Sequence, residues 1–319
     1  MRRGLLIGAL ASAAMAQQLP KDRSIQSDAN IRLIAFADGG KALAATCGDG
    51  KLRIWDVESG APRQVRTDLK LDPASTFGDR SSFVAAVSQN KIRVRDVVAT
   101  SPIRDYEFSS VPRRVALSQD GALLATAYIK ELQTGVNTIE VRDATGKDRF
   151  RTTAGLGGVS VLRFSPDGLM LVAGSNDADV RVWNTRNGEL VRLIEELPVT
   201  MFAASFSPDG RWLATAGVDR IVYLWDAKSW KLVRKITGQP EMISVLDFSP
   251  DGRRLVTGGF SELTAQHPVS LVLWDVPTAK QLRSMPAPKR VAAVAFSPDG
   301  KRIASTTGGN TIELWQVPE

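Results

Sequence analysis

One stretch of the chain, residues 201–226 (MFAASFSPDGRWLATAGVDRIVYLWD), recurs throughout the sequence and limits the folds open to it. Its apolar and polar residues alternate in short runs, which is the pattern of half-buried β-strands and not of a helix. Ser207, Pro208 and Gly210 occupy the positions that a type I turn favours. With the strand expected after Lys228 and Ser229, the stretch predicts one four-stranded antiparallel meander.

The unit occurs in seven copies, spaced 40 to 49 residues apart. The turn motif FSPDG begins at Phe164, Phe206, Phe248 and Phe296, with weaker versions near Phe36 and Leu117. The third strand ends in IWDV, VRDV, VRDA, VWNT, LWDA, LWDV and LWQV in the successive copies. The second copy lacks the turn motif, but residues 77–83 still align with residues 206–212. A regular repeat of this length indicates a solenoid or a propeller.

These seven copies resemble the WD40-repeat family over essentially the whole chain after residue 16. The resemblance implies an all-β fold, a seven-bladed β-propeller of four-stranded antiparallel blades, in one domain over residues 17–319. The chain stops directly after the third strand of the last copy. We therefore expect residues 23–26 to supply the outer strand of that blade, so that an N-terminal strand closes the last blade.

Residues 1–16 are typical of a signal peptide. Arg2 and Arg3 precede an apolar run that is too short to span a membrane, and Ala14 and Ala16 form a small-x-small cleavage site. No Cys follows, so we expect no lipoprotein anchor and no other membrane anchor. The prediction is an exported protein, periplasmic or extracellular, whose net charge falls from +7 to +5 on cleavage.

Composition excludes several kinds of site. The single Cys, Cys47, rules out an internal disulfide, and the single His, His267, rules out histidine clusters. We therefore predict no enzymatic activity, no cofactor and no metal site. The sequence pI is about 9.7, but no dense basic run with interleaved aromatics predicts nucleic-acid binding. The chain is expected to be monomeric as a propeller.

Most conspicuous residues have structural interpretations. The tryptophans of the third strands are expected to pack between blades, and Arg95 and Arg142 take their place in copies two and three. Blades two and three should therefore be the least tightly packed pair. The family often links blades through a hydrogen-bonded Asp, Ser or Thr, Trp and His. Asp49, Asp177 and Asp219 match its Asp, and Thr215, Thr257 and Ser305 match its hydroxyl. No copy has the His, which puts the full set in doubt.

Two copies carry long connections between their second and third strands, at residues 128–137 and 260–268. In the family this connection lies on the same end of the ring as the links between blades, so both loops should rise from one face. Inserted loops on one face often mark the binding face of a repeat protein, although tolerated drift explains them equally well. The candidate partner-binding residues are Arg113, Arg114, Tyr128, Lys130, Glu131, Glu241, Phe260, Glu262, His267, Lys289 and Arg290.

Two functions from different classes remain open. The first, which rests on the resemblance, is a non-catalytic scaffold that docks a protein or peptide on the loop-bearing face. The alternative is a ligand- or glycan-binding periplasmic propeller, of the kind associated with hydrolases, whose glycan or other small anionic ligand would bind in the channel mouth. FSPDG turns also occur in periplasmic propellers of the Tol type, so the turn motif does not separate the two.

Cleavage after Ala16 should give a mature chain that starts at Gln17. N-terminal sequencing of the exported protein checks this expectation, and an exported chain that still starts at Met1 would contradict it.

Overall fold

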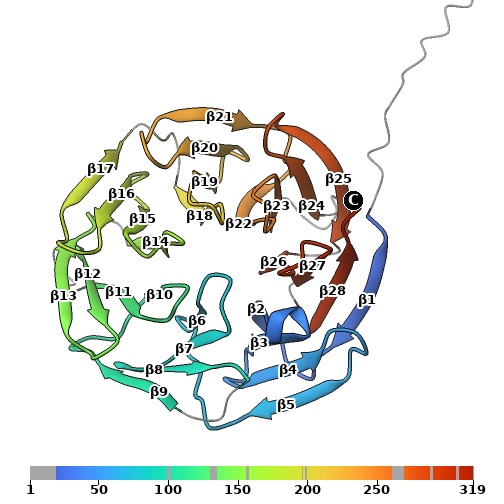
Figure 1. The fold of residues 1–319 in the computed structure, drawn as a ribbon, viewed down its shortest axis with the longest axis horizontal. Coiled ribbons are helices and arrows are strands. Elements are labelled where there is room, and N and C mark those ends of the chain that lie inside the picture. Colours follow the sequence, from blue (N-terminus) through green and yellow to red (C-terminus); the bar gives the residue numbers. More distant parts are fainter. Residues whose placement is uncertain are drawn as a thin grey trace, which may run out of the picture.

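The computed structural model forms a closed ring of four-stranded antiparallel sheets (Figure 1). It describes residues 19–98, 102–129, 135–155, 158–195, 197, 200–260, 269–287, 290–306 and 309–318. The predicted signal peptide and most of the two long loops lie outside these residues. Helix η1 (Asp38–Gly40) is a single short turn. No helix in the described ranges has the length and apolar character needed to cross a membrane.

Each sheet is one blade, and strand order within a blade follows the chain from the channel outward. Blade 1 comprises β2 (Ile31–Ala37), β3 (Ala42–Cys47), β4 (Leu52–Asp56) and β5 (Pro62–Arg66). Blade 2 comprises β6 (Thr76–Phe77), β7 (Phe83–Ser88), β8 (Lys91–Asp96) and β9 (Pro102–Glu107). Blade 3 comprises β10 (Arg114–Leu117), β11 (Leu123–Ile129), β12 (Asn137–Asp143) and β13 (Asp148–Thr153).

The remaining blades continue the same order. Blade 4 comprises β14 (Val159–Phe164), β15 (Met170–Ser175), β16 (Val180–Asn184) and β17 (Leu190–Ile194). Blade 5 comprises β18 (Met201–Phe206), β19 (Trp212–Gly217), β20 (Val222–Asp226) and β21 (Leu232–Ile236). Blade 6 comprises β22 (Met242–Phe248), β23 (Arg254–Phe260), β24 (Val269–Asp275) and β25 (Lys280–Ala287). Blade 7 comprises β26 (Val294–Phe296), β27 (Arg302–Thr306), β28 (Thr311–Gln316) and β1 (Lys21–Gln26).

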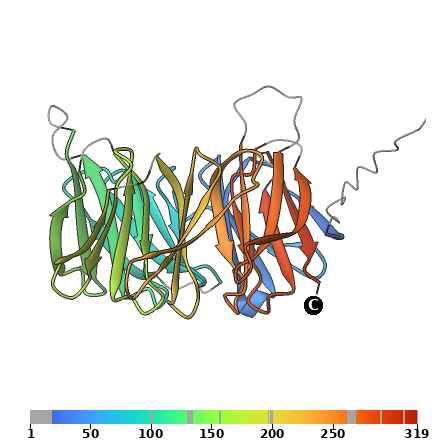
Figure 2. The same cartoon turned by 90° about the horizontal axis from the view of Figure 1, so that it is seen from above.

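The antiparallel order gives the ring two different ends. Turns between first and second strands lie at one end, here called the turn-bearing face, where η1 (blue) stands at the lower edge of Figure 2. Connections between second and third strands, and links between blades, lie at the other end, here called the loop-bearing face. The two long connections join β11 to β12 and β23 to β24, so both belong to the loop-bearing face as predicted.

The FSPDG motifs form the predicted turns. In each, the Ser hydroxyl donates to the Asp carboxylate, and the same oxygen accepts a backbone N–H two residues further on at 3.0 Å. These Asp side chains therefore serve local turn geometry, as expected of Asp in such turns. The residues concerned are Asp167, Asp209, Asp251 and Asp299.

Strand β1 closes the ring as the outer strand of blade 7, which confirms the prediction and extends it to residue 21. It pairs antiparallel with β28, and Ile25 lies opposite Ile312. Ile25 is 2% exposed and packs in the cluster that joins blades 7 and 1. Glu313 accepts a hydrogen bond from the Ser24 hydroxyl at 2.8 Å and forms an ion pair with Lys21 at 2.7 Å.

The tryptophans of the third strands are all buried between adjacent blades, at 2–7% exposure. Three of them donate their indole N–H to a hydroxyl of the second strand, at 2.8–3.0 Å. In blade 6 the series of hydrogen bonds extends by one more step, because Thr257 donates to the side-chain oxygen of Gln239 at 2.7 Å. Gln239 thus takes the position expected of the missing His, which the sequence comparison did not anticipate. The three pairs are Trp225 with Thr215, Trp274 with Thr257 and Trp315 with Ser305.

The Asp residues that match the Asp, Ser or Thr, Trp and His set of the family accept hydrogen bonds from donors in their own blades. Arg53 holds Asp49 through two hydrogen bonds of 2.8 and 2.9 Å, and the Tyr223 hydroxyl donates to Asp219 at 2.7 Å. Arg181 contacts Asp177 at 3.4 Å in the same way. Each donor lies four residues after its Asp, across the turn between second and third strands. A local partner therefore replaces the absent His in these blades.

Arg142 substitutes for Trp in blade 3 through charge. It pairs with Glu140, whose side chain is fully buried, and its guanidinium lies 4.2 Å from the centre of the Phe108 ring. Asp148 adds a second ion pair at 2.8 Å. Ion pairs at this position need hydrogen-bonded geometry to offset desolvation, whereas an indole packs without that cost. The expected looser packing of blades 2 and 3 stays a prediction.

Deletion of residues 21–30 should lower the melting temperature by about 10 °C or more, because the outer strand of blade 7 and its buried Ile25 are lost. Thermal unfolding followed by circular dichroism measures the effect. Lys21→Ala, which removes one surface ion pair, is the control and should shift the melt by no more than about 2 °C. Equal melting of the deletion variant and the intact chain would refute the role of β1 in closure.

Candidate functional site

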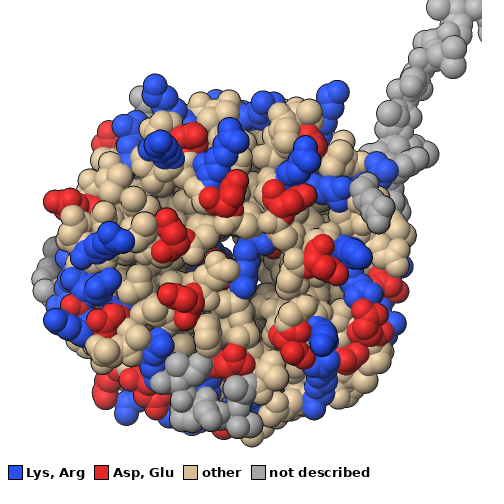
Figure 3. Space-filling view, in the orientation of Figure 1, with Lys and Arg blue, Asp and Glu red and all other residues tan. Residues whose placement is uncertain are grey.

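The centre of the ring is a channel with a cavity of about 390 Å³. Inner strands of the blades line it, and a Lys or Arg side chain stands in the central hollow in the space-filling view (Figure 3). Small ligands commonly bind in cavities of about 300–1,000 Å³ that combine apolar walls with a few polar groups. The channel has this character, since mostly apolar residues line it together with the charged side chains Asp79, Arg80, Arg163 and Asp247.

Charged residues occupy one register position of the inner strands. The residue directly before the inner-strand aromatic (Leu117 in blade 3) is small in most blades, namely Ala35, Thr76, Ala116, Ser205 and Ala295. Blades 4 and 6 place Arg163 and Asp247 there, and both line the cavity. Because side chains alternate across a strand, the buried aromatic faces the core while its neighbour faces the channel.

Blade 2 contributes the other charges through its irregular turn. Strand β6 has only two residues, and the turn that follows carries Asp79 and Arg80 into the cavity. At Gly78 a Cβ would lie 2.3 Å from the Ser81 hydroxyl, so a side chain there would displace this hydroxyl from the Phe83 N–H that it accepts. Arg80 itself has a φ of 53°, an uncommon conformation for a residue with a side chain.

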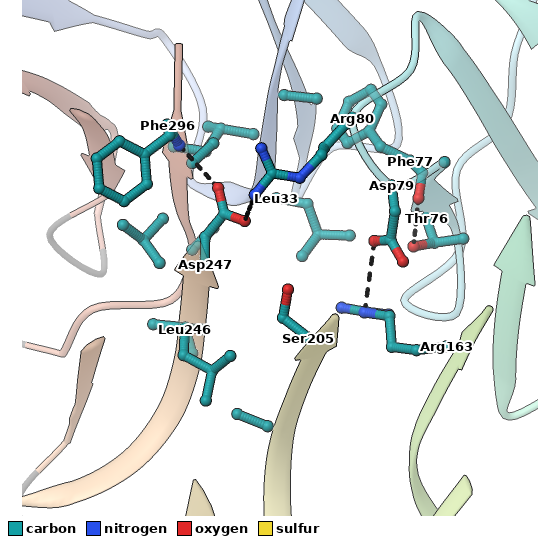
Figure 4. Close-up of a pocket in the computed structure, with 18 of the residues that line it drawn as sticks. Leu33, Thr76, Phe77, Asp79, Arg80, Arg163, Ser205, Leu246, Asp247 and Phe296 are labelled. Atoms are coloured by element: carbon teal, nitrogen blue, oxygen red, sulfur yellow. Dashed lines mark hydrogen bonds and ion pairs between the residues drawn. The ribbon is translucent and has the colours of Figure 1, made fainter. Parts of the chain in front are cut away.

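Arg80 spans the channel from blade 2 to blade 6. Its guanidinium contacts Asp247 at 3.1 Å and donates to the Phe248 carbonyl (Figure 4). The second oxygen of Asp247 accepts the Phe296 N–H of blade 7 at 2.8 Å. Burial raises the pKa of Asp247, and the positive charge of Arg80 opposes that rise. This contact, here called the cross-channel pair, joins three blades through one carboxylate.

A second, looser pair lies beside it. Arg163 approaches Asp79 at 3.5 Å through its Nε, and it donates from Nη1 to the Leu162 carbonyl at 3.1 Å. The side chains of Asp79 and Arg163 keep 46% and 37% of their surface open to the channel. Desolvation inside the ring raises the pKa of Asp79, although Arg163 and Arg80 act in the opposite direction. Figure 4 shows Ser205 between this pair and the cross-channel pair.

The loop-bearing mouth of the channel is shaped by β-bulges. Near the start of β2, β14, β18 and β22 the pairing shifts by one residue, which leaves Arg32, Ser160, Phe202 and Ser244 as the extra residues. A bulge re-aims its side chain and is common at the rims of closed sheets. Phe202 reaches Phe260 of blade 6, with ring centres 6.4 Å apart, and the Arg290 guanidinium lies 5.2 Å from the centre of the Phe260 ring.

The predicted partner-binding residues separate into three groups. Phe260 and Arg290 are brought together, and Arg113 and Arg114 are exposed at the start of β10. Tyr128 and Glu241 are buried instead: the Tyr128 hydroxyl contacts Glu140 at 3.2 Å, and Glu241 accepts from Gln239 at 3.1 Å. The third group lies outside the described residues: Lys130, Glu131, Glu262, His267 and Lys289.

Sequence reasoning missed the charged channel and Phe202. Asp79 and Asp247, which were not among the candidate residues, both line the cavity. Two signals could have found them: the copy without the turn motif, and the charged residues before the inner-strand aromatic. Among the described residues, no group of three His, Cys, Asp or Glu side chains is placed to hold a metal ion.

The cross-channel pair should stabilise the fold measurably. A double-mutant cycle with Arg80→Gln and Asp247→Asn should give a coupling free energy of about 1–3 kcal/mol, because both side chains are largely removed from water. Urea unfolding of the four proteins measures it. The exposed pair Lys91 and Glu107, at 4.0 Å, is the matched control and should couple by less than about 0.5 kcal/mol. Equal coupling in the two pairs would contradict the interpretation.

Comparison with known proteins supports the repeat pattern. The family model for the WD domain, G-beta repeat, matches residues 23–56, 149–184, 196–226, 230–262 and 279–316. Striatin-4 of Mus musculus is 28% identical over 173 residues, which is 50% of this chain and 22% of that protein. Apoptotic protease-activating factor 1 of Rattus norvegicus is 27% identical over 47% of this chain and 13% of its own length. The WD repeat-containing protein SL1-17 of Schistosoma mansoni is 30% identical over 48% of this chain and 50% of that protein.

The match therefore spans half or less of each of these relatives. The family model, in contrast, covers more than half of the 319 residues, and the matched repeats fall on blades of the observed ring. With seven four-stranded blades around a channel, the chain belongs to the WD40-repeat family.

Proposed function

We propose that this protein is a non-catalytic interaction scaffold that docks a protein or peptide at the loop-bearing mouth of its channel. One observation carries the proposal: Phe202, Phe260 and Arg290 form a patch there, contributed by three neighbouring blades. Both aromatic rings are partly exposed and Arg290 is exposed. Aromatic residues and Arg are the side chains most enriched at the energetic centres of protein interfaces.

The charges around this mouth favour an acidic partner. Arg32, Arg113 and Arg114 start inner strands near the same end of the ring, and Arg290 adds a fourth cation. Although Arg114 as a whole is exposed, desolvation of its guanidinium group beside the Ser160 carbonyl lowers its pKa, and the nearby charge of Arg163 lowers it further. A carboxylate from a partner would relieve this crowding of positive charge, because opposite charges favour the protonated guanidinium. We infer a segment that carries acidic residues and one apolar anchor for the two rings.

The described carboxylates support the non-catalytic part of the proposal. Those of the FSPDG turns accept local hydrogen bonds, and Asp49, Asp177 and Asp219 are held by donors of the third strand. Asp79 and Asp247 each face an Arg. General acid–base work needs a carboxyl group within reach of a substrate proton and a pKa suited to the transfer. The contacts of these groups instead serve turns, blades and the channel lining.

We further propose that the scaffold acts outside the cytoplasm, in the periplasm or beyond the cell. The basic, apolar and small-x-small order of residues 1–16 supports this location. The partner would then be a protein of the envelope or an extracellular protein.

Phe260→Ala and Arg290→Gln should each weaken partner capture by about tenfold or more, since an aromatic anchor and its stacked cation are lost. Affinity purification from the producing cells, with quantitative mass spectrometry of the recovered proteins, measures the effect. Leu190→Ala on the outer strand β17 is the matched control, because Leu190 is 52% exposed and far from the mouth.

The decisive comparison is between the proteins recovered by the intact chain and those recovered by its variants, not between the intact chain and an empty resin. A protein recovered equally by the intact chain, Phe260→Ala and Arg290→Gln would show that the patch does not dock it. Recovery of no partner by the intact mature chain would count against the scaffold function itself.

A further inference from the structure

One of the two charged pairs in the channel, Asp79 with Arg163, makes only a long contact and stays open to the cavity. The cross-channel pair is complete, because Asp247 receives Arg80 on one oxygen and the Phe296 N–H on the other. Asp79 and Arg163 meet at 3.5 Å, longer than a good charge-assisted hydrogen bond of about 2.7–2.9 Å. Within the described residues, no hydrogen bond to the Asp79 carboxylate accompanies this contact. Both groups face the cavity and are therefore available to a ligand.

The pairing of opposite charges limits what that ligand can be. An anion alone would approach Arg163 but would be repelled by Asp79 beside it. A metal ion would find too few ligands, since the described residues offer no group of three suitable side chains. A molecule with an ammonium and a carboxylate close together satisfies both partners at once, and it leaves the charge of the channel unchanged.

The rest of the cavity suits a compact amphiphilic molecule. Its volume of about 390 Å³ lies within the range of small-ligand pockets. Leu33, Val161 and Val245 supply apolar surface, and Ser205 supplies a hydroxyl that lies between the two charged pairs in Figure 4. Burial raises the pKa of Asp79, and a cationic group bound beside it would stabilise the ionised carboxylate.

We propose that the channel binds a free α-amino acid, with its ammonium group on Asp79 and its carboxylate on Arg163. The two ligand charges sit on one carbon, which matches two side chains that already lie side by side. Binding replaces the long ion pair between Asp79 and Arg163 with two ion pairs to the ligand, one from each residue. The side chain of the ligand packs against the apolar wall of the cavity. This site lies inside the ring, and its cavity shares one lining residue, Phe202, with the proposed docking patch.

The test is calorimetric titration and thermal unfolding of the mature chain with each of the common L-α-amino acids. At least one should bind saturably and raise the melting temperature. Its deaminated acid and its decarboxylated amine should each bind at least tenfold more weakly, because each loses one of the two ion pairs. For L-leucine these analogues are 4-methylpentanoate and 3-methylbutylamine.

Asp79→Asn and Arg163→Gln should each weaken binding of that amino acid at least tenfold, whereas Glu189→Gln on the outer side of blade 4 should leave it unchanged. The melting of each variant without ligand shows that it is folded. The analogue series in the intact chain remains decisive if a variant does not fold. No binding of any amino acid, or equal binding of the acid and amine analogues, would overturn the proposal.

Discussion

The pairing of β1 with β28 is the contact on which the rest of the ring depends. Every other blade is built from consecutive strands, whereas blade 7 joins residues from the two ends of the chain. Closing a ring removes a free sheet edge and brings the first and last blades into one apolar cluster. Because the channel is defined by all seven inner strands, its shape and its charge pairs exist only when this closure holds.

Within the blades, short-range polar contacts replace the hydrogen-bonded set typical of the family. The Trp and hydroxyl members persist in three blades, and Gln239 completes the chain in blade 6. In blades 1, 4 and 5 an Arg or Tyr four residues after the Asp contacts its carboxylate. Such pairs lie inside one blade, so they orient turns more than they join blades. Adhesion between blades therefore rests mainly on apolar burial, supplemented by polar contacts such as Arg302 with Glu58 and Arg142 with the Glu107 carbonyl.

The functional candidates arise where copies depart from the common pattern. The one copy without an FSPDG turn places Asp79 and Arg80 in the channel, and Asp247 and Arg163 stand where most copies have a small residue. Bulges at the loop-bearing mouth expose Phe202 beside Phe260. Some of these departures also hold the ring together, because Asp247 contacts both Arg80 of blade 2 and Phe296 of blade 7.

The sequence by itself determined the fold class, the number of blades, the closing strand and the FSPDG turns. These follow from local rules: alternation along strands, turn chemistry and a repeat that no single unit can bury alone. Phe260 and Arg290 were named as candidate partner-binding residues from their place beside a long connection and an interblade link, and their role stays a prediction. Only the tertiary structure decided that Tyr128 and Glu241 turn inward, and that Arg80 meets Asp247 across the ring. The Arg80 and Asp247 contact joins residues 167 positions apart, and only ring closure brings them together, which no local pattern encodes.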